Sequence, residues 1–176
     1  MSTGRVVWFT GLSAAGKSTL SAALFSRLSE LGYEVVNLDS DVVRREISQD
    51  LGFSREDRDA HVRRLGFIAA TLASEGSIVI VSAMSPRRST RDEVRAMCAQ
   101  FTEVYVNAPL DVCEQRDPKG LYRRARAGAV RDFVGMDIDY EAPVHPEVEC
   151  RTDLETIEQS SRKLLDYLLD ALSGKG

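Results

Sequence analysis

The stretch Gly11–Thr19 constrains this chain more than any other, because it reads Gly-Leu-Ser-Ala-Ala-Gly-Lys-Ser-Thr. This is the pattern G-x-x-x-x-G-K-[ST], a phosphate-binding loop. Its glycines let the backbone turn tightly and approach phosphate oxygens without a Cβ in the way. The expected phosphate-binding residues are Gly11, Leu12, Ser13, Ala14, Ala15, Gly16, Lys17, Ser18 and Thr19. Lys17 would then contact the β- and γ-phosphates, and the Ser18 hydroxyl would bind Mg²⁺.

The flanking sequence supports this interpretation of the loop. An apolar, strand-like run, Arg5–Thr10, comes directly before it. From Ser18 to Leu31 the apolar residues then recur at helical spacing. Strand, glycine-rich loop and helix N-terminus together form an anion-binding site. The sequence therefore predicts a nucleotide-phosphate site that binds ATP.

The rest of the chain alternates predicted strands and helices. Further strands are expected at residues 34–38, 77–82, 103–106 and near 148–150, and further helices at residues 54–74, 90–100 and 154–172. This alternation predicts a doubly wound α/β domain over residues 1–176, of the P-loop NTPase type. Its mostly parallel five-stranded sheet would carry helices on both faces. Ligands of such sheets bind beyond the carboxyl ends of the strands.

Composition limits the partners. The net charge of −4 argues against a general nucleic-acid or anionic-membrane binder. No apolar run is long enough to span a bilayer, and the N-terminus lacks a signal-peptide pattern. The three scattered cysteines suit a reducing compartment and buried positions, so we expect a cytoplasmic protein.

The metal chemistry is predicted at the second strand rather than the third. Many phosphate-loop proteins hold Mg²⁺ with an acid after an apolar strand, but the most apolar strand here ends in Ser82-Ala83-Met84. Asp39 and Asp41 follow the second strand and are the candidate metal ligands together with Ser18. Asp41 is also the candidate general base for an attacking hydroxyl. The alternative is that this pair only caps the next helix.

Other side chains indicate an anionic, aromatic second substrate. Arg44 follows the Asp pair by one helical turn, and Arg58 and His61 share a helix face. Arginine binds phosphate-like groups bidentately, and an exposed Phe53 or Phe133 offers a stacking surface for a purine.

A glycine-interrupted basic segment at about residues 114–136 is predicted to be a mobile, partly helical lid rather than core. It would close over the phosphates and exclude water. Its cations are Arg116, Lys119, Arg123, Arg124, Arg126 and Arg131.

In these motifs, and from about residue 5 to residue 172, the chain is similar to the adenylylsulfate kinase (APS kinase) family. The likeness includes Gly11–Thr19, Leu38-Asp39 with Asp41 and Arg44, Leu51-Gly52-Phe53-Ser54 with Glu56-Asp57-Arg58, Ser85-Pro86, Arg116-Asp117 and Lys119-Gly120-Leu121-Tyr122. The loop is shared by many families, whereas the motifs around Phe53 and Lys119 are much more specific. The chain departs from the family pattern at Ser40, His61 and Arg87, and within Phe133–Met136.

The resemblance implies Mg²⁺-ATP-dependent phosphorylation of the ribose 3′-hydroxyl of adenosine 5′-phosphosulfate (APS) by a homodimer. The substrate residues that it implies are Asp39, Arg44, Phe53, Arg58, His61, Met84, Ser85, Lys119, Leu121 and Phe133, with the adenine between the two phenylalanines. The implied catalytic residues are Lys17, Asp41 and Ser85. A phosphoserine intermediate has been proposed for the serine matching Ser85, but direct in-line transfer needs none, so we favour a positioning role.

Two alternatives stay open at this stage. One is a P-loop kinase for another small hydroxyl acceptor, of the shikimate or gluconate type, in which Phe53 and Phe133 would lack a purpose. The other is an APS-binding regulator without activity, although Lys17, Ser18 and Asp41 are all present. A GTPase would need an N-K-x-D guanine-binding motif, which the sequence lacks.

Overall fold

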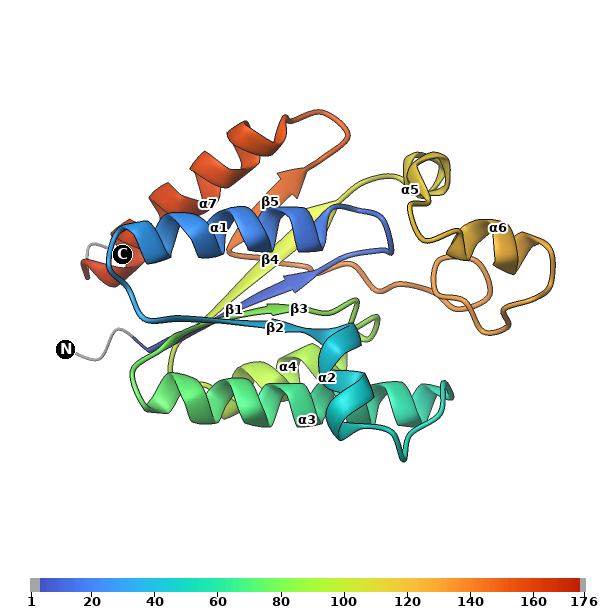
Figure 1. Ribbon diagram of the computed structural model, residues 1–176, viewed down its shortest axis with the longest axis horizontal. Coiled ribbons are helices and arrows are strands. Elements are labelled where there is room, and N and C mark those ends of the chain that lie inside the picture. Colours follow the sequence, from blue (N-terminus) through green and yellow to red (C-terminus); the bar gives the residue numbers. More distant parts are fainter. Residues whose placement is uncertain (1–3, 175–176) are drawn as a thin grey trace.

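The structure of the protein is a computed structural model that describes residues 4–174. Within this range the chain contains one five-stranded sheet (Figure 1). The strands are β1 (Arg5–Thr10), β2 (Val35–Asp39), β3 (Ile78–Ser82), β4 (Phe101–Asn107) and β5 (Val148–Arg151). Their order across the sheet is β2-β3-β1-β4-β5, and every neighbouring pair is parallel. The predicted fold class is confirmed, and the sheet is parallel throughout.

The described residues also form seven helices, six of them between strands and the last after β5. They are α1 (Lys17–Glu30), α2 (Ser40–Ile47), α3 (Arg55–Ser74), α4 (Arg88–Met97), α5 (Leu110–Arg116), α6 (Leu121–Arg126) and α7 (Ile157–Leu172). Ser54 caps α3 as predicted, its hydroxyl accepting from the Asp57 N–H. The last helix begins later than predicted, because Thr156 and Gln159 form a capping box there.

Side chains of β1 alternate between two apolar layers, as the two-residue period of a strand requires. Val7 and Phe9 face α1 and α7, whereas Val6 and Trp8 face α3 and α4. Figure 1 shows α1 and α7 on one side of the sheet and α3 and α4 on the other. Burial on both faces explains why residues 6–9 of β1 and 78–81 of β3 are apolar without interruption. Within residues 4–174, no helix combines the length and apolarity needed to cross a membrane.

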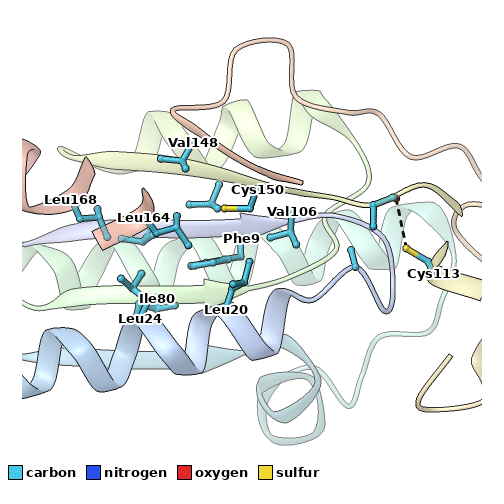
Figure 2. Packing of buried hydrophobic residues seen from close by; sticks show 14 of the residues in the cluster. Phe9, Leu20, Leu24, Ile80, Val106, Cys113, Val148, Cys150, Leu164 and Leu168 are labelled. Atoms are coloured by element: carbon cyan, nitrogen blue, oxygen red, sulfur yellow. Dashed lines mark hydrogen bonds between the residues drawn. The ribbon is translucent and has the colours of Figure 1, made fainter. Parts of the chain in front are cut away.

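The layer around α1 and α7 includes two of the cysteines (Figure 2). Cys150 belongs to the same buried cluster as Leu164 and Leu168 of α7, and the thiol of Cys113 donates to the carbonyl of Ala108 at 3.7 Å. Both are buried and Cys98 is partly buried, and all three thiols are free. The expectation of buried cysteines therefore holds for two of the three.

The basic segment at residues 114–136 is only partly a surface lid. Tyr122 and Phe133 are 2% and 6% exposed, and they pack edge to face with ring centroids 5.0 Å apart. Both join the layer around α1 and α7. The prediction that the segment lies outside the core is wrong for these two aromatics, because they bury enough apolar surface to anchor it.

Candidate active site

The phosphate-binding loop lies between β1 and α1 in a strained conformation. Gly11 and Gly16 have positive φ angles of 154° and 112°, and Ala14 lies at 63°. A Cβ at Gly11 would stand 2.3 Å from the carbonyl oxygen of Val106, so only glycine fits there. Backbone N–H groups in such a turn converge on an anion. This backbone geometry suits a phosphate cradle at the N-terminus of α1, which stays our prediction.

Lys17, the first residue of α1, turns back over the loop. Its Nζ donates to the carbonyls of Gly11 and Leu12 at 2.8 and 2.7 Å. Burial of the ammonium group lowers the pKa of Lys17 from 10.5 to about 8, while Cys113, Asp41 and Asp39 act in the opposite direction. The lysine is therefore charged at neutral pH and held close to where phosphates would lie.

Asp39 and Asp41 stand at the start of α2 but have different partners. Asp39 is the N-cap, its Oδ1 accepting from the N–H of Asp41 at 2.8 Å and of Val42 at 3.3 Å. Asp41 is not a cap. Its exposed carboxylate accepts from Lys119 Nζ at 2.6 Å. The capping alternative therefore applies to Asp39 alone, whereas Asp41 faces the basic segment.

Phe53 is held out into solvent by two arginines. Its side chain is 66% exposed, with the guanidinium carbons of Arg44 and Arg58 at 4.5 and 5.8 Å from the ring centroid. The same arginines donate to the backbone, Arg44 to the Gly52 carbonyl and Arg58 Nε to the Phe53 carbonyl at 2.9 Å. Burial lowers the pKa of both guanidiniums. An exposed ring beside two cations is suited to an aromatic anion.

The basic segment is fastened to the rest of the site from three directions. Arg116 donates to the carbonyls of Ala14 and Ala15 in the loop, both at 3.3 Å, and to Thr152. The Tyr122 hydroxyl donates to the Ser13 carbonyl at 2.8 Å. On the opposite side Arg58 donates to the Asp132 carbonyl at 2.6 Å. Together with the Lys119–Asp41 pair, these bonds join the segment to the phosphate-binding loop, α2 and α3.

One cavity of about 640 Å³ joins these groups. Of the sequence-predicted residues, those that line it are Ser13, Ala14, Gly16, Lys17, Ser18, Thr19, Asp39, Asp41, Arg44, Phe53, Arg58, His61, Met84, Ser85, Lys119 and Leu121. Phe133 does not line the cavity, because its ring packs on Tyr122 instead. The structure therefore does not present two exposed phenylalanines facing one another.

Ser85 is buried, and its hydroxyl is engaged in a hydrogen-bond network. Oγ accepts from Trp8 Nε1 at 3.0 Å and lies 3.2 Å from both Thr10 Oγ1 and the Ala83 carbonyl. The residue is 3% exposed and has a positive φ of 43°. A hydroxyl held this way is suited to shaping the end of β3 rather than to attacking a phosphate, so a positioning role remains our hypothesis.

His61 is enclosed rather than presented to solvent. It is 3% exposed, and its ring nitrogens contact the hydroxyls of Ser40 and Ser48. Burial, and next the charge of Arg44, lower the pKa of His61 from 6.5 to about 4. The imidazole is therefore neutral at physiological pH.

The site residues fit Mg²⁺ carried by a nucleotide. Among the described residues no group of three or more His, Cys, Asp or Glu side chains could hold a metal alone. Mg²⁺ does not require such a cage, since it binds through one or two carboxylates, waters and substrate phosphates. Ser18, Asp39 and Asp41 supply hard oxygen donors along the cavity. Ser82 Oγ also lies at this edge, buried and without a protein partner among residues 4–174, as expected of a group that bonds to a bound ligand.

Arg116, Thr152 and Ser82 also line the cavity. Sequence reasoning placed Arg116 only among the cations of the lid, and it assigned no ligand contact to Thr152 or Ser82. Arg116 belongs to the Arg116-Asp117 motif, and its charge could have indicated a place in the site. Thr152 lies on the loop after β5 and hydrogen-bonds the Ala15 carbonyl at 2.5 Å. No local pattern marks it.

Known proteins resemble this chain over nearly all of its length. A family model described as adenylylsulphate kinase matches residues 3–151. An adenylyl-sulfate kinase of Rippkaea orientalis is 55% identical over 165 residues, covering 94% of this chain and 91% of that protein. A relative of the same name from Chloroflexus aurantiacus is 55% identical over 169 residues, covering 96% and 89%.

Solved structures agree with these sequence relatives. The Mycobacterium tuberculosis APS kinase CysC, in complex with AMPPNP and APS, is 40% identical with a TM-score of 0.91, covering 94% of this chain and 98% of that one. A gluconokinase from Sinorhizobium meliloti is 16% identical with a TM-score of 0.63, covering 99% and 97%, and so shares only the fold.

Proposed function

The chain belongs to the adenylylsulfate kinase family, and on that premise we propose that it transfers the γ-phosphate of ATP to the 3′-hydroxyl of APS. The products are 3′-phosphoadenosine 5′-phosphosulfate (PAPS) and ADP. The observation that carries the proposal is one cavity with a phosphate-binding loop, a carboxylate at Asp41 and an exposed phenylalanine between two arginines. A sugar or shikimate acceptor has no purine to stack on Phe53.

Each half of the cavity has its own task in this proposal. The loop N–H groups and Lys17 bind the β- and γ-phosphates and stabilise the charge that develops during transfer. Ser18 and, through water, the carboxylates of Asp39 and Asp41 would hold Mg²⁺, which would supply positive charge to neutralise the phosphates. Phe53 stacks on the adenine of APS, and Arg44 and Arg58 bind its anionic groups.

Asp41 accepts the proton of the attacking 3′-hydroxyl. Its Oδ2 is bonded to Lys119, so the lysine must release or share this carboxylate when APS binds. The phosphosulfate is an alternative anion for the Lys119 ammonium. We infer that substrate binding draws Lys119 from Asp41 to the phosphosulfate and so frees the base. Met84, Leu121 and Ser85 line the same acceptor region, and Phe133 supports it from within the lid.

The test is to incubate the protein with Mg²⁺-ATP, with and without APS, and to separate the nucleotides by ion-exchange chromatography. PAPS and ADP should appear in equal amounts and only with APS present, and Lys17→Met should abolish both. ADP released equally with and without APS would refute the proposal. Binding of APS without PAPS formation would instead support the regulatory alternative.

Assembly and location follow from the family resemblance. We propose a homodimer in the cytoplasm, where free thiols such as those of Cys98, Cys113 and Cys150 persist. A hexameric APS kinase from Thiobacillus denitrificans is 35% identical with a TM-score of 0.72, and this chain covers 29% of that one. Light scattering after size-exclusion chromatography measures the mass of the assembly. A mass of twice 19.5 kDa would support the dimer.

A further inference from the structure

One imidazole connects both ends of helix α2. His61 lies on α3 and is 3% exposed. Its Nε2 lies 3.0 Å from the hydroxyl of Ser40, the first residue of α2, and its Nδ1 lies 2.9 Å from the hydroxyl of Ser48, the C-cap. Ser48 is itself 1% exposed. A buried, fully satisfied chain of this kind specifies one arrangement of the groups that it joins.

Helix α2 has few other attachments. It is 8 residues long, and Val43 is its only buried residue. A helix of this length does not hold its shape alone, so its position depends on tertiary contacts. The Asp39 cap ties its first turn to β2. Two side chains of α3 hold its far end: Arg64 donates from the surface to the carbonyl of Ile47 at 3.1 Å, and the buried His61 contacts the Ser48 hydroxyl.

Two groups of the proposed reaction depend on where α2 lies. Asp41 in its first turn is the proposed base, and Arg44 one turn later contacts the ring of Phe53. Asp41 is exposed and Arg44 is half-buried, and both side chains line the cavity. A tilt of α2 would move the carboxylate and the guanidinium together.

We propose that His61 is a positioning residue: through Ser40 and Ser48 it holds both ends of α2 and so sets the places of Asp41 and Arg44 relative to the acceptor. The inference rests on the proposed function for its kinetic consequence but not for its geometry. A neutral imidazole donates from one nitrogen and accepts at the other, and each serine hydroxyl can take either role. Both tautomers therefore satisfy the two serines, so this role requires no contact between His61 and the acceptor.

Ser48 gives the decisive test, because it is one of the two partners of His61 but does not line the cavity. Ser48→Ala removes one end of the connection without altering the cavity wall. Ser77→Ala is the matched control. Ser77 is also a buried serine, 4% exposed, with one side-chain bond to Glu34 at 3.0 Å. It comes just before β3, at the amino end of that strand, whereas the phosphate-binding loop follows the carboxyl end of β1.

We expect Ser48→Ala to raise the KM for APS or lower kcat, by about 3- to 30-fold in kcat/KM for APS, because small misplacements of reacting groups are costly. The KM for ATP should stay within about twofold. His61→Leu should cause a loss at least as large, and the Ser48→Ala/His61→Leu double variant should be no worse than His61→Leu. Ser77→Ala should leave these constants unchanged.

Hydrogen exchange provides a readout that does not need the reaction. Backbone amides of residues 41–48 should exchange faster in Ser48→Ala than in Ser77→Ala. This measurement decides the inference even if the wild-type protein forms no PAPS, a result that would refute only the proposed function. Unchanged exchange in α2, or equal kinetic effects of Ser48→Ala and Ser77→Ala, would overturn the positioning role. A loss in His61→Leu with normal Ser48→Ala would likewise do so and would indicate direct contact with the acceptor.

Discussion

Replacing Phe53 by alanine tests the acceptor half of the site most directly. The side chain is 66% exposed, and the neighbouring arginines bond to the carbonyls of Gly52 and Phe53, not to the ring alone. Alanine keeps both carbonyls, so Arg44 and Arg58 retain these backbone anchors. The variant thus removes the aromatic surface and little else.

The structure sets the size of the effect on folding stability and of the effect on the KM for APS. About a third of a ring of roughly 200 Å² is buried, which at ~25 cal/mol/Å² limits the loss of folding free energy to about 2 kcal/mol, so the variant should remain folded. Stacking of one base on an aromatic ring contributes about 1–3 kcal/mol. Its loss corresponds to a KM for APS that is about 5- to 150-fold higher. The KM for ATP should stay within about twofold.

The assay measures initial rates of PAPS formation while APS and ATP are varied separately. Phe53→Trp is the control, because it keeps a stacking surface and should restore most of the APS affinity. If Phe53→Ala raises both KM values equally, or if Trp does no better than Ala, adenine stacking on this ring is refuted.

Three further predictions concern single groups of the site. Asp41→Asn should lower kcat by about 10²- to 10⁴-fold through loss of the general base, with little change in the KM for ATP; steady-state kinetics would contradict the assigned role if kcat fell less than threefold. ATP affinity, measured by calorimetry, should fall by up to about tenfold per pH unit above pH 8. The reason is that Lys17 of the unliganded protein loses its proton near pH 8, whereas phosphate binding requires its charged form. Lys17→Met should lack this pH dependence. Finally, the folded state lowers the pKa of His61 to about 4, so its stabilising effect is complete above pH 6.5 and lost progressively between pH 6.5 and 4. Urea unfolding should show about 2 kcal/mol of destabilisation between pH 7.5 and 5 that is missing in His61→Leu, and equal losses in the two proteins would contradict the neutral imidazole.

The proposed pH effect at His61 involves several neighbouring charges. Arg44 on α2 and Arg64 on α3 disfavour its protonation, while Asp41 favours it. Burial is the largest cause, so the direction of the pKa shift does not depend on any one of these charges. Comparison with His61→Leu removes the contribution of the carboxylates that titrate in the same range.

Much of the fold was predictable because its signals are local. The apolar run at β1 and the glycine-rich loop are legible from neighbouring residues, as is the Ser54 cap. The start of the last helix was predicted too early, because the N-terminal capping box at Thr156 was overlooked. Asp39 and Asp41 could be placed at the same strand end, but which one caps α2 depends on side-chain orientation.

The lid shows where local patterns were insufficient. Glycines and cations predicted a mobile surface segment, yet Tyr122 and Phe133 lie in the core. Both aromatics are visible in the sequence. No local pattern, however, predicts that their rings pack into the apolar layer around α1 and α7. Burial of these rings depends on the path of the whole chain.

By itself, then, the sequence determined the parallel α/β fold, the phosphate-binding loop and the family, since these follow from short-range periodicity and from motifs. The tertiary structure alone decided the pairing of Lys119 with Asp41, which are 78 residues apart. It also decided the burial of Phe133 and the connection of His61 to both ends of α2. It left the buried Ser82 hydroxyl without a hydrogen-bond partner among residues 4–174. The physical reason is that hydrogen bonds and ion pairs require approach within about 3 Å. Chain folding, and not sequence separation, brings such groups together.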